Sequence, residues 1–403
     1  MAVRQFGFPN IVPISGIRLA SAAAGLYRDR PDVVLIELQS GSQSAAVFTR
    51  NAFAAAPVLV AKRHLQQQMP RYLLINAGNA NAATGQIGIE HALSCCQALA
   101  QACELNPEQV LPFSTGVIGV NLPTEKILRS LPALRRDLAA NNWQAAAGAI
   151  MTTDTQAKAV YKRIAIGDDS IHLAAFAKGA GMIRPDMATM LAFIFTDVAI
   201  SSRRLQNCLA AAVAESFHCI SIDGDTSTND AVFLGATAQA SALDENNAAH
   251  LALFQQALNE LCLELALMIV CDGEGATKLI HLQVSEGESA SACRQVGFTV
   301  AHSPLVKTAF FASDPNWGRI LAAVGRAGLT DLDTGKITVY LDELCLFRNG
   351  ARAAEYSESS AKAIMLQKEI SVRIQLGRGE HAANIWTTDL SHDYVSINAD
   401  YRS

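Results

Sequence analysis

Aromatic residues, charges and paired cysteine motifs are all scarce in this chain of 403 residues. Aromatic residues make up only 6% of the sequence and charged residues 17%, whereas half of the residues are hydrophobic. Such a composition allows a large buried core and excludes global disorder. The net charge is −5 and no basic block with interleaved aromatics occurs, so nothing indicates a nucleic-acid partner.

The order of charged and apolar residues indicates neither a targeting signal nor a membrane span. The N-terminus has no charged segment followed by an apolar one, which is the mark of a signal peptide. No apolar run approaches the roughly 20 residues that a bilayer-spanning helix needs. We therefore expect a cytoplasmic protein with no membrane partner.

Metal-binding and phosphate-binding motifs are absent as well. The nine cysteines include no C-x-x-C pair and the nine histidines no H-x-x-x-H pair, so we expect buried thiols and no zinc site. Asp223, Asp225 and Asp230 lack the register of a calcium loop, and residues 272–275 lack the spacing of a P-loop. We expect neither a metal nor a redox cofactor.

Alternating strand-like and helix-like segments indicate an α/β fold of packed layers. The segments expected as strands are 33–38, 45–48, 58–61, 72–76, 159–166, 171–177, 190–195, 279–284, 336–341, 370–376 and 394–397. The segments expected as helices are 89–104, 124–138, 143–151, 204–216, 248–270 and 316–325. A chain of this length is longer than one ordinary hydrophobic core supports, so we expect two or three packed layers or domains.

The centre of the chain has a glycine-rich loop that runs directly into an apolar strand, with Thr189 at the junction. A threonine hydroxyl is a weak nucleophile unless a base lies beside it. If the bond between Ala188 and Thr189 were cut, the new α-amine of Thr189, with a pKa of about 7.7–8.0, could accept the hydroxyl proton. From these residues alone, an ordinary loop-to-strand connection with a β-forming threonine is the favoured interpretation.

The segment KGAGMIRPDMATMLAFIFTD at 178–197 resembles the cleavage segment of the ornithine acetyltransferase family, also called ArgJ or glutamate N-acetyltransferase. Similar blocks recur in order at 45–51, 76–82, 114–119, 151–155, 223–230, 272–278, 303–308, 314–319 and 398–402. The resemblance implies a helix-sheet-sheet-helix sandwich of the ornithine acetyltransferase and DmpA type, with a smaller α/β C-terminal portion. It also implies self-cleavage into an α chain of residues 1–188 and a β chain of residues 189–403.

The same resemblance assigns roles to residues that the bare sequence would leave as ordinary turns. It makes Thr189 the nucleophile and places the oxyanion hole at Thr115 and Gly116. The residues that it assigns to substrate binding are Thr152, Lys178, Thr189, Glu274, Asn398 and Ser403. Serine at position 403 replaces the family's usual threonine but keeps the hydroxyl group.

The implied reaction moves acetyl from N2-acetyl-L-ornithine to L-glutamate through acetyl-Thr189, within cyclic arginine biosynthesis. The implied assembly is an α2β2 heterotetramer, and acetyl-CoA stays open as a second acetyl donor. Two alternatives remain: a related self-cleaving aminopeptidase or amidase with water as acceptor, and a binding or structural oligomer that never cleaves.

Overall fold

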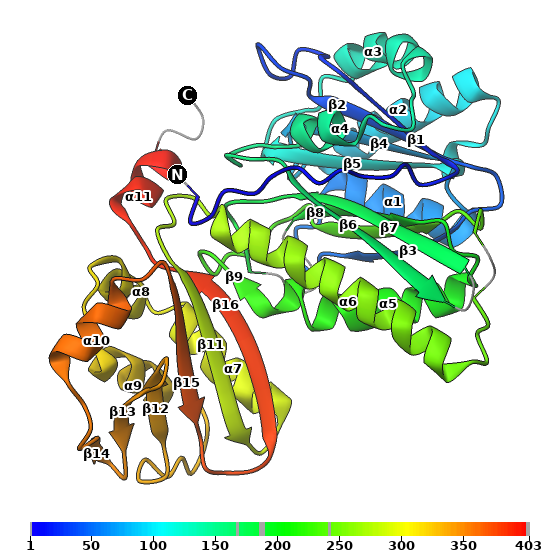
Figure 1. Cartoon of the computed structure of the whole chain (residues 1–403). Coiled ribbons are helices and arrows are strands. Elements are labelled where there is room, and N and C mark those ends of the chain that lie inside the picture. The colour runs from blue at the N-terminus through cyan, green and yellow to red at the C-terminus, as the bar shows by residue number, and fades with distance from the viewer. Residues whose placement is uncertain (1, 167–168, 185–189, 241–242, 400–403) are drawn as a thin grey trace.

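The structure is a computed structural model that describes residues 2–166, 169–184, 190–240 and 243–399. Its first sheet has the strand order β1-β2-β4-β5, with β4 and β5 parallel and the other pairs antiparallel (Figure 1). The bounds of these strands are β1 Ile17–Ala22, β2 Val33–Leu38, β4 Tyr72–Asn79 and β5 Val110–Val117.

The second sheet has the order β3-β10-β8-β7-β6, in which only β8 and β10 run parallel. Its strands are β3 Gln43–Phe48, β6 Lys158–Ile166, β7 Asp169–Lys178, β8 Leu191–Thr196 and β10 Ala231–Ala236. The sequence between β7 and β8 contains the glycine-rich loop and the predicted nucleophile. That loop therefore joins two neighbouring, hydrogen-bonded strands.

The two sheets pack face to face, with helices on both outer faces. Side chains of both sheets meet in one core cluster, which includes Ile36, Phe113 and Phe193. Helices α2 (Gly85–Cys103) and α3 (Thr124–Arg136) pack on the outer face of the first sheet. Helices α5 (Ser202–Ala214) and α6 (Ala248–Cys271) pack on the outer face of the second. The predicted helix-sheet-sheet-helix sandwich is confirmed.

Several of the few aromatic side chains lie in the layer between the sheets. Phe113 meets Phe193 edge-on with ring centroids 5.1 Å apart, and Trp143 meets Phe195 in the same way at 5.8 Å. Trp143 begins the short helix α4 (Trp143–Ala149), and α1 (Ala56–Gln67) packs against β5. Such edge-to-face contacts add to the burial energy and fix the spacing of the two sheets.

A smaller α/β portion follows, as expected. Its seven-stranded sheet has the order β14-β13-β12-β15-β11-β16-β9. The strands are β9 Ile220–Ser221, β11 Leu279–Gly287, β12 Thr338–Leu341, β13 Leu344–Arg348, β14 Ala351–Arg352, β15 Glu369–Gln375 and β16 His381–Thr388. Its helices are α7 Ala290–Ala301, α8 Pro304–Phe311, α9 Trp317–Gly325, α10 Glu358–Met365 and α11 His392–Ala399. Short 3-10 turns occur at Pro107–Gln109 and Phe217–Cys219.

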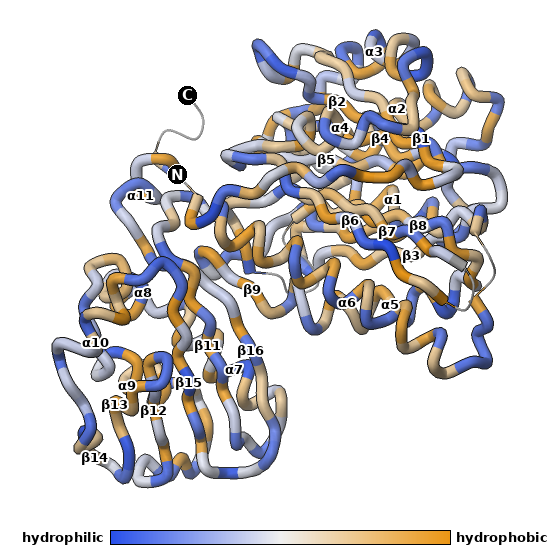
Figure 2. Tube along the Cα trace, viewed as in Figure 1, coloured by the Kyte–Doolittle hydropathy of each residue, from blue (hydrophilic) through white to orange (hydrophobic). Residues whose placement is uncertain are grey.

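One face of this third sheet is apolar and the other polar. Ile280, Leu282 and Val284 of β11 pack with α7 side chains in the core of the C-terminal portion. Hydrophobic and hydrophilic residues alternate along the strands of this sheet (Figure 2). This is the pattern of a sheet that helices cover on one side only.

Two segments predicted as strands are helices instead. Residues 58–61 lie in α1, where Pro57 occupies the first turn and suits a helix start. Residues 394–397 lie in α11, where the side chains of Val395 and Ile397 are exposed. In both places β-branched residues suggested strands, but neither segment finds a strand partner.

Helix α6 extends only one residue beyond the expected helix 248–270, but it is apolar enough to pass a test for membrane spans. Its 24 residues are enough to cross a membrane by length and composition alone. However, 56% of its most apolar window is buried inside the fold, where the helix packs on β6 and α5. A core helix passes the same test, so α6 is weak evidence for a membrane span.

Candidate active site

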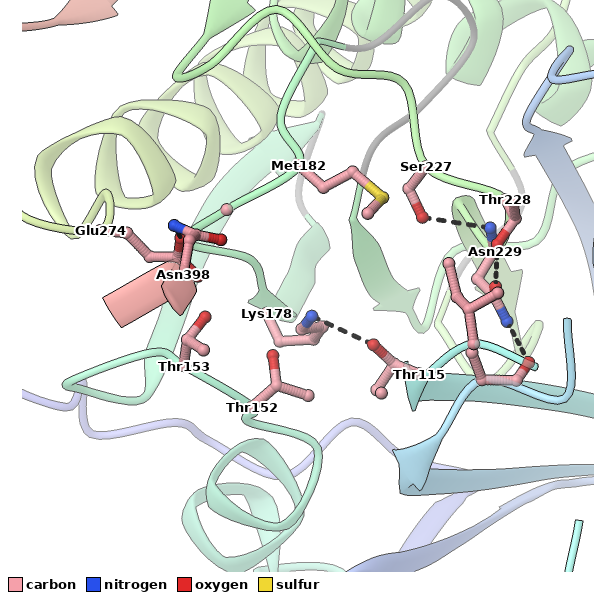
Figure 3. Close-up of a pocket in the computed structure, with 14 residues that line it drawn as sticks. Thr115, Thr152, Thr153, Lys178, Met182, Ser227, Thr228, Asn229, Glu274 and Asn398 are labelled. Atoms are coloured by element: carbon pink, nitrogen blue, oxygen red, sulfur yellow. Dashed lines mark hydrogen bonds between the residues drawn. The ribbon is translucent and has the colours of Figure 1, made fainter. Parts of the chain in front are cut away.

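Six of the residues predicted for the site line a single pocket of about 610 Å³, which is partly open to solvent. They are Thr115, Gly116, Thr152, Lys178, Glu274 and Asn398. Figure 3 shows Lys178 between Thr115 on one side and Glu274 with Asn398 on the other. Ala188, Thr189 and Ser403 lie outside the described residues.

The pocket opens where the two sheets of the sandwich end. Strand β5 contributes Thr115 and Gly116 near its end, and β7 ends at Lys178. Strand β8 begins at Leu191, and the carbonyl of Met190 accepts a hydrogen bond from Ala231 N at 2.9 Å. The strand that follows Thr189 is thus held between β7 and β10.

The turn at Gly116 requires glycine. Its φ is +129°, a value that residues with a side chain rarely adopt, and a Cβ atom would lie 2.4 Å from the backbone carbon of Gly78. The backbones of β4 and β5 therefore approach more closely here than any other residue would permit. Beneath the turn, Ser114 Oγ donates to Asn76 Oδ1 at 2.6 Å, which fixes the two strand ends.

The hydroxyl of Thr115 is oriented by a neighbouring cation. Lys178 Nζ donates a hydrogen bond to Thr115 Oγ1 at 3.1 Å, so the hydroxyl's own proton stays available for an acceptor in the pocket. Burial lowers the pKa of Lys178, while the carboxylate of Asp154 acts in the opposite direction. A buried ammonium group next to a hydroxyl donor is well suited to stabilise developing negative charge.

Lys158 forms a buried ionic cluster that sequence reasoning missed. Its Nζ lies 2.6 Å from Asp154 Oδ1 and 2.6 Å from Asp272 Oδ2, and all three side chains are fully buried. Burial alone would raise the pKa of Asp154, but the charges of Lys158 and Lys178 hold it well below its usual range. A lone lysine in a strand gives no local sequence signal for such a cluster.

The ionic cluster connects three loops of the pocket. Asp154 accepts hydrogen bonds from Thr152 N at 3.0 Å and from Gly179 N at 2.7 Å. Asp272 lies two residues before Glu274. One ammonium group therefore fixes the loops of Thr152, Lys178 and Glu274 relative to one another.

Asn229 is a second residue that sequence reasoning missed. Its Nδ2 donates to Ala80 O at 2.6 Å and to Ser114 O at 2.9 Å. Asn229 lies just before β10, whereas Ala80 directly follows β4 and Ser114 lies in β5, so Asn229 ties one sheet to the other (Figure 3). The motif at 223–230 contains Asn229, but only its three aspartates were considered, as candidates for a calcium loop.

Glu274 and Asn398 form the far wall of the pocket. Asn398 Nδ2 donates to Glu274 Oε2 at 2.7 Å, and Glu274 N donates to Ala180 O at 2.8 Å. Gly181 makes room for the carboxylate, because a Cβ there would lie 2.4 Å from Glu274 Cδ. Glu274 is thus a buried anion placed across the pocket from the Lys178 cation.

Within the described residues no group of three or more His, Cys, Asp or Glu side chains could hold a metal ion. All nine cysteines are free, and burial raises the pKa of the Cys96 and Cys262 thiols. Buried thiols with raised pKa values are poor nucleophiles. The described residues that line the pocket offer mainly hydroxyl, ammonium, amide and carboxylate groups.

Comparisons with known proteins identify the family of this chain. The model of the ArgJ family matches residues 18–403. The chain is 53% identical over 396 residues to an arginine biosynthesis bifunctional protein ArgJ of Methylococcus capsulatus, covering 98% of this chain and 97% of the relative. It is 52% identical over 407 residues to the protein of that name from Pseudomonas fluorescens, covering all of both chains.

A crystal structure of an arginine biosynthesis bifunctional protein ArgJ from Bacillus halodurans is also similar. It is 36% identical, with a TM-score of 0.50, and the match covers 52% of this chain and 99% of that one. The family match over nearly the whole sequence and the two relatives of about 50% identity establish the family. The chain belongs to the ArgJ family.

Proposed function

We propose that this protein transfers acetyl from N2-acetyl-L-ornithine to L-glutamate in arginine biosynthesis, through an acetyl ester on Thr189. The observation that carries the proposal is the pocket itself: residues from separate segments of the chain, predicted from their motifs, line one cavity. Membership in the ArgJ family supports the same reaction.

The nucleophile arises by self-cleavage between Ala188 and Thr189. Thr189 Oγ attacks the Ala188 carbonyl, the peptide bond is exchanged for an ester, and water hydrolyses that ester to free the Thr189 amine. Residues 1–188 and 189–403 then form the α and β chains, which we propose assemble as an α2β2 heterotetramer in the cytoplasm. Met182, six residues before Ala188, has a φ of +54°, a strained value for a residue with a side chain, which supports a strained approach to this bond.

In turnover, the Thr189 amine takes the proton of Oγ, which attacks the acetyl carbonyl of N-acetylornithine. The Thr115 hydroxyl and the Gly116 N–H donate to the oxyanion. The C–N bond breaks, ornithine leaves with the proton, and acetyl remains on Oγ. Glutamate then attacks the ester through its amine, which regenerates the Thr189 hydroxyl. We propose that the reaction needs no cofactor.

The charges of the pocket suit an amino-acid substrate. Lys178 is placed to receive a carboxylate, and Glu274 lies on the opposite side near Asn398 (Figure 3). The side-chain ammonium of ornithine is the natural partner of the Glu274 carboxylate. Thr152 lines the pocket together with Lys178, and its hydroxyl offers a further polar contact to the substrate.

The function is tested by assaying purified protein with N-acetylornithine and glutamate. We expect two fragments in place of one 42.9 kDa chain, and acetylglutamate formed in large excess over free acetate. Release of acetate without transfer would indicate the related hydrolase instead. An intact, inactive chain would indicate a binding or structural protein.

Thr115→Ala should lower kcat by about 10²–10³-fold, because one oxyanion-hole donor is lost while the fold is kept. Steady-state kinetics with N-acetylornithine measure the loss. Thr153→Ala is the matched control, since it removes a hydroxyl from the same pocket that has no proposed role in catalysis. An equal loss in both variants would contradict the role of Thr115.

Glu274→Gln should raise the KM for N-acetylornithine by roughly 10- to 100-fold. This factor corresponds to the binding free energy that a hydrogen bond to a charged group contributes. The hydrogen bond from Asn398 is kept, since the glutamine side chain still offers an oxygen. Glutamate has no side-chain cation, so its KM should change much less. An unchanged KM for N-acetylornithine would rule out this contact.

A further inference from the structure

Lys178, the cation of the proposed site, is buried and therefore needs an anion nearby to stay charged. Burial lowers its pKa, because the ammonium form loses its hydration. Both proposed roles of Lys178 require that form, since it receives a substrate carboxylate and donates to Thr115 Oγ1 (Figure 3). A neighbouring carboxylate must therefore oppose the effect of burial.

Among the described residues, the carboxyl groups with the largest effect on Lys178 are those of Asp154, Asp230 and Glu274, in that order. Burial raises the pKa of Asp230 well above its usual range, so this group is protonated near neutral pH and supplies little negative charge. Glu274 lies across the pocket, where Asn398 Nδ2 donates to it at 2.7 Å and where we place the substrate's cation. Asp154 is thus the carboxylate that supports Lys178 while the pocket is empty.

Asp154 also fixes the backbone that directly follows Lys178. Strands β6 and β7 pair with Lys158 opposite Ala177, so the loop before β6 lies beside the end of β7. From this loop, Asp154 Oδ1 accepts a hydrogen bond from Gly179 N at 2.7 Å. Gly179 has a φ of +153°, which residues with a side chain rarely adopt, so the carboxylate stabilises an uncommon turn at the end of the strand.

The remaining contacts of Asp154 keep its carboxylate in place and ionised. Its Oδ2 accepts a hydrogen bond from Thr152 N at 3.0 Å, and its Oδ1 lies 2.6 Å from Lys158 Nζ. Burial would raise the pKa of Asp154, but the charges of Lys158 and Lys178 hold it well below its usual range. The charge of Lys158 also lowers the pKa of Lys178, so Lys158 opposes the pocket cation and Asp154 separates the two.

Asp272, the other carboxylate of the ionic cluster, has different partners. It accepts hydrogen bonds from Thr155 N at 3.0 Å and from the Thr155 hydroxyl, besides its ion pair with Lys158. It is not among the groups whose charges act most on Lys178. The cluster therefore contains two buried carboxylates with one shared ammonium group, of which only Asp154 supports the pocket cation.

We propose that Asp154 is a positioning residue of the transfer reaction, which keeps Lys178 charged and holds it beside Thr115. This inference rests on the proposed function and deepens it. Asp154 is not one of the described residues that line the pocket, so it acts through Lys178 and does not touch the substrate. Because Lys178 receives the substrate carboxylate, Asp154 also determines up to which pH the pocket accepts an amino acid.

The pH profile of kcat/KM for N-acetylornithine tests this role. In Asp154→Asn the side chain still offers an oxygen to Gly179 N but has no negative charge, so the pKa of Lys178 falls further. The ammonium form is then lost at lower pH, and we expect the alkaline limb of the profile to move down by at least about one pH unit. The acid limb, where the Thr189 amine gains a proton, should stay in place.

Asp272→Asn is the matched control. It removes a carboxylate of the same cluster that is equally buried and equally 2.6 Å from Lys158 Nζ. Both variants should unfold at lower urea concentrations than the wild type, but only Asp154→Asn should move the alkaline limb. Equal shifts in both variants, or an activity loss in Asp154→Asn that is the same at every pH, would show a structural role alone and overturn the proposal.

Nuclear magnetic resonance on wild-type protein with isotope-labelled lysine side chains decides the question even if Asp154→Asn does not fold or cleave itself. The signal of Lys178 is assigned by its loss in Lys178→Arg. We expect this signal to titrate below those of the exposed lysines and to show an ammonium group near neutral pH. A neutral Lys178 at that pH, or one that titrates like an exposed lysine, would overturn the proposal. A wild-type protein that makes no acetylglutamate would instead refute the proposed function, and the titration would still report the charge of Lys178.

Discussion

Thr189→Ala leaves one chain of 42.9 kDa that makes no acetylglutamate. The substitution removes the hydroxyl that attacks Ala188 and that later carries acetyl, so cleavage and transfer fail together. Loss of a catalytic nucleophile elsewhere costs on the order of 10⁶-fold in kcat, and we expect a comparable loss here. Intact mass of the purified protein and an acetylglutamate assay measure the two effects.

Thr189→Ser is the matched control, because it keeps the hydroxyl and loses only a methyl group. It should still yield a fragment that begins at residue 189 and should retain measurable transfer. If Thr189→Ala were cleaved or fully active, the N-terminal nucleophile would have to be abandoned.

Lys158→Met should destabilise the fold by about 3–5 kcal/mol, the usual effect of removing one partner from a buried ion pair. The methionine has a similar volume, so the loss is electrostatic: Asp154 and Asp272 stay buried without their shared cation. The shift of the urea unfolding midpoint measures the effect. A Thr189→Ala background keeps the protein as one chain during unfolding.

Lys162→Met provides the comparison for Lys158→Met. Lys162 lies on the same strand, and its partners Glu260 and Glu264 are about half exposed. Exposed pairs contribute about 0–1 kcal/mol, so this variant should unfold almost as the wild type does. Similar midpoints for the two variants would show that the buried cluster does not stabilise the protein.

The alternation of apolar strands and helices was enough to predict the layered fold. Residues 159–166, for example, were expected as a strand and form most of β6. The strand predictions were wrong where tertiary contacts override the local preference of the residues for a strand. Residues 58–61 are rich in β-formers, but they pack in α1 with Val58 and Val60 in different core clusters. The exposed side chains of α11 gave no burial pattern to interpret.

The pocket residues were predicted from motifs that resemble a family, since each is an ordinary turn residue when considered alone. Lys158 and Asn229 show what such motifs leave out. Lys158 is 114 residues from Asp272, and Asn229 is 115 residues from Ser114, and no local pattern encodes contacts over these separations. Lys158 meets Asp272 because α6 packs on the second sheet, and Asn229 meets Ser114 because the two sheets pack together; only the three-dimensional structure contains this packing.

The strand order of the second sheet has a consequence for the timing of the proposed self-cleavage. Its strands β3, β7 and β6 precede the proposed cut, whereas β10 and β8 follow it, and β10 lies between β3 and β8. Each product taken alone would therefore expose unpaired apolar strand edges that aggregate readily. We therefore expect the proposed cut to follow assembly of the sheet, and the two pieces expressed from separate genes to aggregate rather than recombine.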